Sequence, residues 1–367
     1  MSIFAQHVSS EQADFYSVGD ASFYAVGDAS LHAVGDAWRV GDLALDGRAF
    51  LAPMAGVTDL AMRRLARRFG AALAFSEMVA SGDLAGGGRE SLRRALGSGV
   101  TPHAVQIAGC EPASMAEAAR KSEAAGADLI DINMGCPAKR VVGGAAGSAL
   151  MRDLDHAASL IGAVARAVSI PVSVKMRLGW DEASLNAPEL ARRAEAEGAQ
   201  MIVVHGRTRN QFYRGEADWA AIRPVVEAVT IPVVANGDCR RPQDAQKMLE
   251  QSGARAVMIG RAALGQPWLV GEIGFFLRHG QERPALPGPL RREAAREHYA
   301  ALLDLFGPAQ GLRHARKHLA AYADVAAQSG GGLDASGRRL LVASEDTQQV
   351  FDLLDRLYDE TPKAEAA

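Results

Sequence analysis

Eight short apolar runs, separated by segments with helical periodicity, constrain the fold of this chain more than any other feature. Each run is four or five residues long and is followed by turn residues, which is typical of a fully buried parallel strand. The runs are Ala49–Ala52, Leu73–Ser76, His103–Ile107, Leu129–Asn133, Val172–Met176, Met201–His205, Val233–Asn236 and Ala256–Ile259.

The segments between the runs predict amphipathic helices, among them Asp59–Phe69, Pro112–Ala125, Ala187–Glu197 and Pro242–Gln251. Eight strands with intervening helices in about 240 residues match the size of a (β/α)8 barrel. A doubly wound sheet is the competing fold, but it would show fewer strands and a glycine fingerprint after the first strand, and none follows Ala52. We therefore predict an α/β protein with a TIM barrel.

A proline-rich hinge ends the barrel pattern, and only helical patterns follow it. The hinge contains Pro284, Pro287 and Pro289, and the helical patterns cover Arg291–Leu305, Leu312–Ala327 and Thr347–Tyr358. The sequence therefore predicts three regions: a leader over residues 1–40, a barrel over 41–283 and an all-helical domain over 290–360.

The leader contains an eight-residue repeat in three copies, which begin at Phe15, Phe23 and Leu31. A period of eight is far shorter than that of any solenoid, and each copy carries a Gly-Asp turn signal. We expect a poorly ordered leader, with a binding role as the weaker alternative.

Charge and cysteine content exclude several classes of protein. The net charge is -3, with 40 basic and 43 acidic residues, so any contact with nucleic acid must depend on a local patch. Three cysteines without a Cys-x-x-Cys pair argue against a disulfide framework and against a zinc site. No apolar run approaches the roughly 18 residues that span a bilayer. We expect a cytoplasmic, monomeric protein without a metal.

Polar residues stand where the predicted strands end. An enzyme with this fold builds its site from the C-terminal ends of the strands. Any one of these residues could be a cap or a satisfied buried polar group, but seven at equivalent positions predict an active site. They are Glu77, Gln106, Asn133, Lys175, His205, Asn236 and Arg261.

The last two strands are followed by glycine-containing turns, Asn236-Gly237-Asp238 and Gly260-Arg261. In such barrels these two loops bind phosphate through backbone N–H groups, and an arginine adds a bidentate cation. Lys175 would place a fixed cation in the barrel mouth, which suits the anionic edge of a reduced flavin. Gln106 offers a donor and an acceptor to the pyrimidine edge of the same ring. These residues together predict a phosphate-bearing cofactor.

A cysteine lies in the loop after the fourth strand, in Asn133-Met-Gly-Cys136-Pro, ahead of a glycine-rich stretch over residues 143–147. A thiol held above a ring can act as a general acid. The alternative, a small buried hydrophobe, is the commoner fate of a lone cysteine, and we adopt it for Cys110 and Cys239.

At these residues the chain resembles the tRNA-dihydrouridine synthases, and most closely the bacterial B-type branch with its nitrogen-regulation-linked relatives. The motifs run in family order between residues 49 and 270. They are Leu51–Asp59 (LAPMAGVTD), Asp131–Lys139 (DINMGCPAK), Val174–Gly179 (VKMRLG), Val204–Thr208 (VHGRT), Ala235–Asp238 (ANGD) and Met258–Ala262 (MIGRA).

The resemblance implies an enzyme that reduces a uridine of tRNA. NADPH, or NADH, would reduce FMN, and hydride would then pass to C6 of a uridine extruded from its stack, while Cys136 protonates C5. The implied FMN-binding residues are Pro53, Met54, Ala55, Gln106, Lys175, His205, Asn236, Gly237, Asp238, Gly260 and Arg261.

Two sets of residues are candidates for RNA contact. Arg313, Arg316 and Lys317 fall at i, i+3 and i+4 of one helix, flanked by His314 and His318. The alternative is that these residues form an ordinary solvated helix face. The second set surrounds the predicted site and would grip the target and its backbone: Asn133, Lys139, Arg140, Arg177, Arg207 and Arg209.

Two other functions compete with this one. A reductase or dehydrogenase acting on a free pyrimidine, like the dihydroorotate dehydrogenases, has a similar flavin barrel and a similar Asn-x-x-Cys-Pro turn. A flavin-bearing, RNA-binding regulatory protein without catalysis is the other alternative. The added helical domain favours the tRNA enzyme, because a free base needs no RNA-sized surface.

Overall fold

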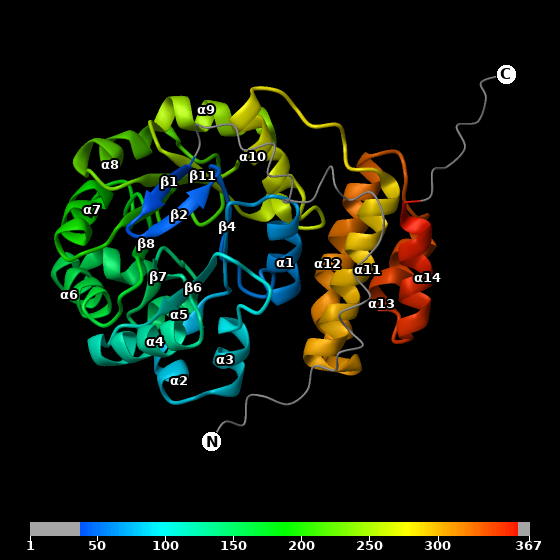
Figure 1. Cartoon of the computed structure of the whole chain (residues 1–367), viewed down its shortest axis with the longest axis horizontal. Helices are drawn as coiled ribbons and strands as arrows, with labels where there is room; N and C mark the ends of the chain where they lie inside the picture. Colours follow the sequence, from blue (N-terminus) through cyan, green and yellow to red (C-terminus); the bar gives the residue numbers. More distant parts are fainter. Residues whose placement is uncertain (1–36, 359–367) are drawn as a thin grey trace.

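The computed structural model describes residues 37–358, and its centre is a closed barrel of parallel strands (Figure 1). In spatial order these are β3 (Ala49–Leu51), β4 (Leu73–Phe75), β6 (His103–Ala108), β7 (Leu129–Met134), β8 (Val172–Arg177), β9 (Met201–His205), β10 (Val233–Asn236) and β11 (Ala256–Ile259). Pairing of β11 with β3, and of β4 with β6, completes the ring. The TIM-barrel prediction is confirmed, and each predicted strand end differs from the observed one by at most one residue.

The outer layer consists of helices that bury one face against the sheet. Each main crossover carries one, because parallel neighbours need a long connection. In chain order they are α1 (Leu60–Arg68), α2 (Ser81–Ala85), α3 (Arg89–Ala95), α4 (Pro112–Ala124), α6 (Leu154–Ala165), α7 (Ala187–Ala196), α8 (Arg223–Ala228), α9 (Pro242–Ser252) and α10 (Leu269–His279). Between them lie α5 (Lys139–Gly143), η4 (Gly147–Arg152), η5 (Ala220–Ile222), η6 (Arg261–Ala263) and a two-residue strand, β5 (Val79–Ala80), which pairs with β6.

A hairpin of β1 (Ala37–Val40) and β2 (Leu43–Asp46) covers the N-terminal end of the barrel. Val40 and Leu45 are buried in one cluster with Phe50, and Trp38 stacks on Phe50 at 5.9 Å between ring centroids. The prediction of a disordered leader over residues 1–40 is therefore wrong for residues 37–40. These residues form a strand that covers apolar side chains at the N-terminal end of the barrel. The octapeptide repeats lie outside the described residues.

The C-terminal part is a group of four helices, α11 (Gly288–Phe306), α12 (Pro308–Gln328), α13 (Ala335–Ala343) and α14 (Thr347–Leu357). Three of them were predicted. The sequence pattern did not reveal α13, because its only buried residues are Gly337 and Leu341, which is too little for an apolar face.

The helical part packs on α1 and on Trp268, which directly precedes α10 (Figure 1). Leu65 and Phe69 of α1 share a buried cluster with Trp268 and with the side chains of α11, α12 and α14. Close contact is also visible at Gly265, where a Cβ would lie 2.4 Å from the carbonyl carbon of Ala321. Within residues 37–358, every helix is too short or too polar to cross a bilayer.

Candidate active site

A cavity of about 390 Å³ opens at the C-terminal ends of β3, β8, β9, β10 and β11. This is the end of the barrel where the fold places its chemistry. Nine of the predicted cofactor-binding residues line it: Pro53, Met54, Lys175, His205, Asn236, Gly237, Asp238, Gly260 and Arg261. Of the other two, Ala55 is exposed at the surface of the β3–α1 turn, and Gln106 is buried beside the cavity.

Lys175 brings a positive charge to the cavity from the end of β8. Its Nζ donates to Oδ1 of Asn236 at 3.1 Å, while Nδ2 of Asn236 donates to the carbonyl oxygen of Met258 at 2.8 Å, so the Asn236 amide has one orientation. Burial, together with the nearby Arg177 guanidinium, lowers the pKa of Lys175 to about 8. The ammonium form still predominates at neutral pH.

His205 supplies a neutral imidazole next to this cation. Burial, followed by the charges of Lys175 and Arg177, holds the pKa of His205 well below its usual value. Its Nε2 lies 3.3 Å from Nη1 of Arg207, and a guanidinium can only donate. Nε2 is therefore the acceptor and Nδ1 carries the proton.

The turn after β10 is built for close approach of a ligand to the backbone. Gly237 has φ +124°, and a Cβ there would lie 2.6 Å from Cβ of Ala217 and 2.9 Å from the His205 ring. Only glycine fits this position. Asp238 then accepts from Arg207 at 2.5 Å and from Arg261 at 3.5 Å, which leaves the largely exposed Arg261 guanidinium at the rim.

The turn after β3 forms the opposite wall. Thr58 Oγ1 accepts from the Met54 N–H at 2.9 Å, and the Gly56 N–H donates to the carboxylate of Glu77, which follows β4. Burial raises the pKa of Glu77, and this hydrogen bond opposes the shift. The polar residue after β4 therefore fixes the turn rather than entering the cavity.

A chain of buried hydrogen bonds runs across the strand ends to the cysteine loop. Ser173 Oγ and Gln106 Nε2 both donate to Asp131, each at 2.6 Å. Oε1 of Gln106 accepts from Nδ2 of Asn133 at 2.8 Å, and Oδ1 of Asn133 accepts from the backbone N–H of Cys136 at 3.0 Å. The position of the cysteine thus depends on side chains from three strands.

The loop itself holds Cys136 by its backbone and leaves its side chain partly exposed. The carbonyl oxygen of Cys136 accepts from Ser148 Oγ at 2.9 Å and from Ser148 N at 3.1 Å. A thiolate at Cys136 would raise the pKa of Lys175, so the two groups lie within electrostatic reach. Cys136 is not among the residues that line the cavity. Cys239 does line it, but burial raises the pKa of Cys239 to about 12, which keeps it an inert thiol.

Arg177 and Arg207 are not placed to grip RNA, contrary to the sequence-based expectation. Both side chains are at most 2% exposed. Arg177 donates to the carbonyl oxygens of Gly135, Thr208 and Phe212 at 2.8 to 2.9 Å, and Arg207 donates to Gly215 O and to Asp238. They tie the loops around the site together because buried carbonyl groups require donors. Asn133 is likewise buried, with its amide committed to Gln106 and Cys136.

The other cationic candidates lie at or near the surface. Lys139 and Arg140 are exposed on α5, whereas Arg209 packs its guanidinium 4.5 Å from the ring centre of Trp180. Arg313, Arg316 and Lys317 are exposed on α12. Nζ of Lys317 reaches across to the β3–α1 turn, where it would lie 2.5 Å from a Cβ on Gly56. His318 does not belong to this cationic stripe, because it is buried.

Sequence reasoning missed three residues of the site. In the sequence, Asp131 differs from its neighbours only as a charged residue within an apolar strand, and this feature could have identified it as a site residue. Ser148 lies in the short 3-10 helix η4 and Tyr213 in a turn, and neither carries a pattern of its own. The Tyr213 ring nevertheless lines the cavity, with the Arg261 guanidinium 4.7 Å from its centre.

Comparisons with known proteins agree with this geometry. Residues 50–333 match the family described as Dihydrouridine synthase (Dus). The chain is 51% identical to a "Probable tRNA-dihydrouridine synthase" of Rhizobium leguminosarum bv. phaseoli, over 86% of this chain and 97% of that protein. It is 48% identical to the "tRNA-dihydrouridine synthase B" of Pseudomonas aeruginosa, over 77% and 86%.

Solved structures support the fold alone. Histamine dehydrogenase from Rhizobium sp. 4-9 superposes with a TM-score of 0.53 at 14% identity, covering 67% of this chain and 47% of that one. A 2-naphthoyl-CoA reductase gives a TM-score of 0.52 at 11% identity, covering 67% and 52%.

Proposed function

The chain belongs to the dihydrouridine synthase family, and from this premise we propose that it reduces a uridine of tRNA to 5,6-dihydrouridine with FMN held in the barrel mouth. The observation that carries the proposal is the joint position of the cavity and Cys136 at the C-terminal end of one barrel. The match to the family over residues 50–333 and the names of relatives about 50% identical support the substrate class.

The residues around the cavity fit FMN. A volume of about 390 Å³ lies within the range of pockets that hold cofactors of this size. The glycine turns at Gly237 and Gly260 together with the Arg261 guanidinium suit a phosphate, since they combine close backbone approach with a cation. Lys175 and the neutral His205 suit the polar edge of the ring system.

Bound FMN would supply hydride chemistry, accepting a hydride from NADPH or NADH and delivering it to C6 of the uracil. The residues of the chain supply charge and orientation. The Lys175 ammonium stabilises negative charge that develops beside it, and its hydrogen bond to Asn236 keeps it aimed at the cavity.

Cys136 would complete the reaction by giving its proton to C5 of the uracil. Asn133 and Ser148 fix the backbone on both sides of the thiol, which holds the sulfur in one place. A proton donor placed in this way contributes roughly 10²- to 10⁴-fold to a rate.

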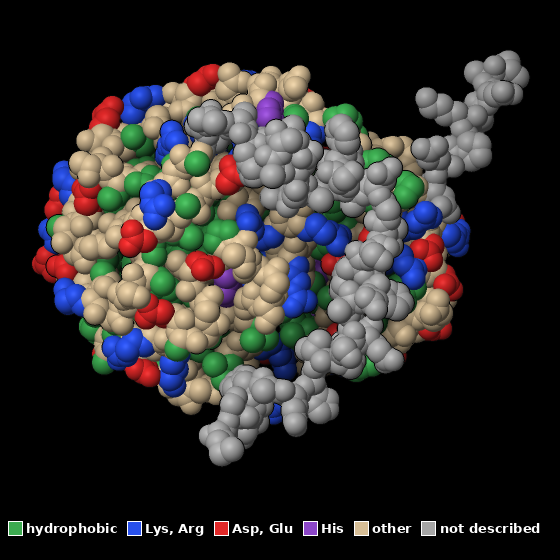
Figure 2. All heavy atoms as spheres, viewed as in Figure 1, with side chains coloured by type: hydrophobic (Ala, Val, Ile, Leu, Met, Phe, Trp, Pro, Cys, Tyr) green, Lys and Arg blue, Asp and Glu red, His purple; other side chains and the backbone are tan. Residues whose placement is uncertain are grey.

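The tRNA would lie across the boundary between the barrel and the helices. On the face shown in Figure 2, Lys and Arg side chains gather near this boundary, while acidic and basic side chains alternate around the rim of the barrel. Lys317 reaches the β3–α1 turn at the mouth of the cavity, and Arg313 and Arg316 continue the positive charge along α12. Such charges position a phosphate backbone without reading its sequence.

The decisive experiment combines FMN content with turnover. Purified protein should carry FMN and convert unmodified tRNA transcript to a product with dihydrouridine, measured by mass spectrometry with NADPH or NADH. Cys136→Ala should keep FMN and lose roughly 10²- to 10⁴-fold in turnover. Cys110→Ala removes a partly exposed thiol outside the cavity and should behave like wild type.

Four results would contradict the proposal. Protein that cannot be reconstituted with FMN would remove the cofactor. Turnover of dihydroorotate or orotate, with no change in the transcript, would favour a free pyrimidine as substrate. Full activity of Cys136→Ala would remove the proton donor, and tRNA binding without any turnover by wild type would favour a regulatory protein.

A further inference from the structure

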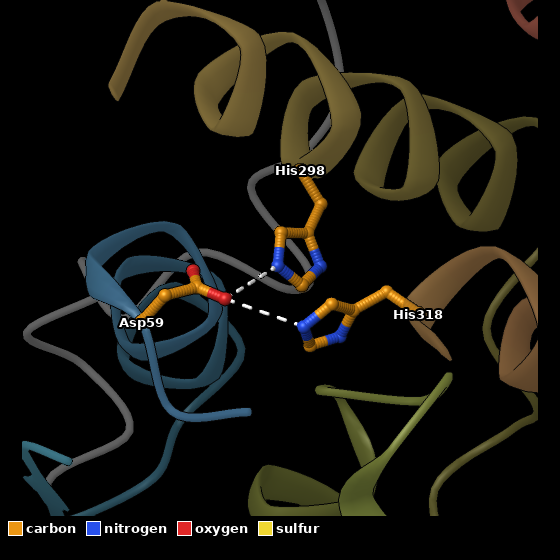
Figure 3. A group of neighbouring side chains, drawn as sticks. All are labelled: Asp59, His298 and His318. Atoms are coloured by element: carbon orange, nitrogen blue, oxygen red, sulfur yellow. Dashed lines mark hydrogen bonds and ion pairs between the residues drawn. The ribbon is translucent and has the colours of Figure 1, made fainter. Parts of the chain in front are cut away.

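Three buried side chains from distant parts of the sequence meet where the barrel contacts the helices (Figure 3). Asp59 ends the β3–α1 turn and caps α1, His298 lies on α11 and His318 on α12. Their side chains are at most 5% exposed, and one ligand atom from each lies within 4.8 Å of the other two. None of them lines the cavity of the proposed active site.

Two of the three distances within this cluster match those of a coordination site, and the third is at most 4.8 Å. Oδ2 of Asp59 lies 3.3 Å from Nε2 of His298 and 3.3 Å from Nε2 of His318. Bonds of about 2.0 to 2.1 Å in a tetrahedron place neighbouring ligand atoms about 3.4 Å apart. The other oxygen of Asp59, Oδ1, accepts from the Met62 N–H at 3.0 Å, which leaves Oδ2 as a single, fixed donor atom.

Hydrogen bonding accounts for only part of the His318 ring. It is 2% exposed, and its Nδ1 has no hydrogen-bond partner among residues 37–358, while its Nε2 lies 3.3 Å from Oδ2 of Asp59. A buried polar group without a partner destabilises the folded state.

His298 has the outer hydrogen bond that a ligating histidine usually has. Its Nδ1 lies 3.0 Å from the hydroxyl oxygen of Tyr322, which is itself buried. When Nδ1–H donates to that oxygen, the Nε2 lone pair faces Oδ2 of Asp59 across the centre of the cluster. Such second contacts fix the tautomer and the ring orientation of metal ligands.

We propose that Asp59, His298 and His318 bind one divalent transition-metal ion of the Zn²⁺ type, with a solvent molecule completing the tetrahedron. Two imidazoles and one carboxylate form a donor set suited to Zn²⁺ rather than to Ca²⁺ or Mg²⁺, which prefer oxygen. The ion fastens α11 and α12 to the turn that forms one wall of the cavity. The site escaped sequence analysis because Asp59 and His298 are 239 residues apart, and the cysteine pattern argued against zinc.

The test uses the full-length protein and a readout independent of activity. After treatment with a chelator and removal of the chelator, wild type is titrated with Zn²⁺ by calorimetry, and its melting temperature is recorded with Zn²⁺ and with Mg²⁺. We expect one Zn²⁺ per chain and a melting temperature that rises with Zn²⁺ alone, since a ligand that binds only the folded state stabilises it.

Two variants and a control locate the ion. His318→Gln removes one ligand but keeps a polar side chain, and it should weaken Zn²⁺ binding by more than about 100-fold, the upper end for loss of an outer contact. Tyr322→Phe removes only the outer contact and should cost about 10- to 100-fold. His156→Ala removes a partly exposed histidine on α6 and should bind like wild type.

The proposal is overturned if wild type binds no Zn²⁺ and its melting temperature is unchanged. It is equally overturned if His318→Gln binds Zn²⁺ as wild type does, because the ion would then lie elsewhere. The wild-type titration decides the matter even if a variant fails to fold. FMN content and tRNA turnover are measured separately, so failure of the metal site leaves the proposed enzyme intact.

Discussion

The side-chain amide of Gln106 has one orientation because its Nε2 donates to the carboxylate of Asp131 at 2.6 Å. An ionised carboxylate can only accept, so the amide nitrogen must face it and the amide oxygen must face Asn133. Asn133 in turn presents its oxygen to the N–H of Cys136. Asp131 touches neither the cavity nor the cysteine, yet it fixes the two side-chain amides that hold the backbone of Cys136.

Two substitutions of Asp131 distinguish the contribution of its hydrogen bonds from that of its charge. Asp131→Ala leaves the Gln106 amide without its acceptor, and a buried polar group without a partner costs about 1 to 3 kcal/mol. We expect about 5- to 100-fold weaker FMN binding, measured by fluorescence titration. Asp131→Asn can still accept from Gln106 and donate to Ser173, so it should lose much less. Wild-type affinity in both variants would contradict the role given to Asp131.

Gly147 sets the path of the cysteine loop. It has φ +61°, and a Cβ there would lie 2.8 Å from the carbonyl oxygen of Cys136. Gly147→Ala should therefore displace the thiol and lower turnover by about 100-fold, as misplacement by about 1 Å can do. Gly143→Ala is the matched control, because nothing lies within 4 Å of its added methyl group. Similar kinetics for the two variants would refute this view of the loop.

Close packing at Gly265 joins the barrel to α12. Gly265 and Gly280 have nearly equal φ values, +75° and +69°, so alanine should cost each about 1 to 2 kcal/mol in backbone strain. Only at Gly265 would the new methyl group meet another backbone, that of Ala321. Gly265→Ala should therefore lower the free energy of unfolding by about 1 to 3 kcal/mol more than Gly280→Ala does, measured by urea denaturation. Equal losses would show that the contact can relax.

His103 should make the barrel sensitive to acid. Burial, and then the charge of Arg63, lower its pKa from 6.5 to about 4, while Nδ1 lies 3.1 Å from Arg63 and Nε2 lies 2.9 Å from Ala95 O. Because the folded-state pKa is below the unfolded one, the unfolded chain binds more protons between these values. Stability present above pH 6.5 is therefore lost as pH falls toward 4.

The measurement compares wild type with His103→Gln, whose amide can replace both hydrogen bonds. Between about pH 7 and about pH 5, wild type should lose about 2 kcal/mol more unfolding free energy than the variant, and other buried histidines contribute equally to both. Parallel pH profiles of the two proteins would show that His103 is not the sensor.

Local pattern was sufficient for the barrel and for much of the candidate site. Buried parallel strands are short apolar runs, and the fold brings their C-terminal ends together, so Lys175, His205 and Asn236 could be assigned to one site before any contact was known. The turn glycines and Cys136 were recognisable for the same reason, because each directly follows a strand.

Only the tertiary structure decided which partner each polar side chain contacts. Arg177 and Arg207 resemble RNA-binding arginines in sequence, but closure of the barrel surrounds them with carbonyl groups that need donors. His318 belongs to a basic stripe by its spacing, yet it is buried and its ring lies against Asp59 at the end of the β3–α1 turn. The amino-acid sequence by itself determined the periodic burial that specifies strands and helices. Pairings between residues hundreds of positions apart required the packed molecule, because periodicity says which face is buried but not what lies against it.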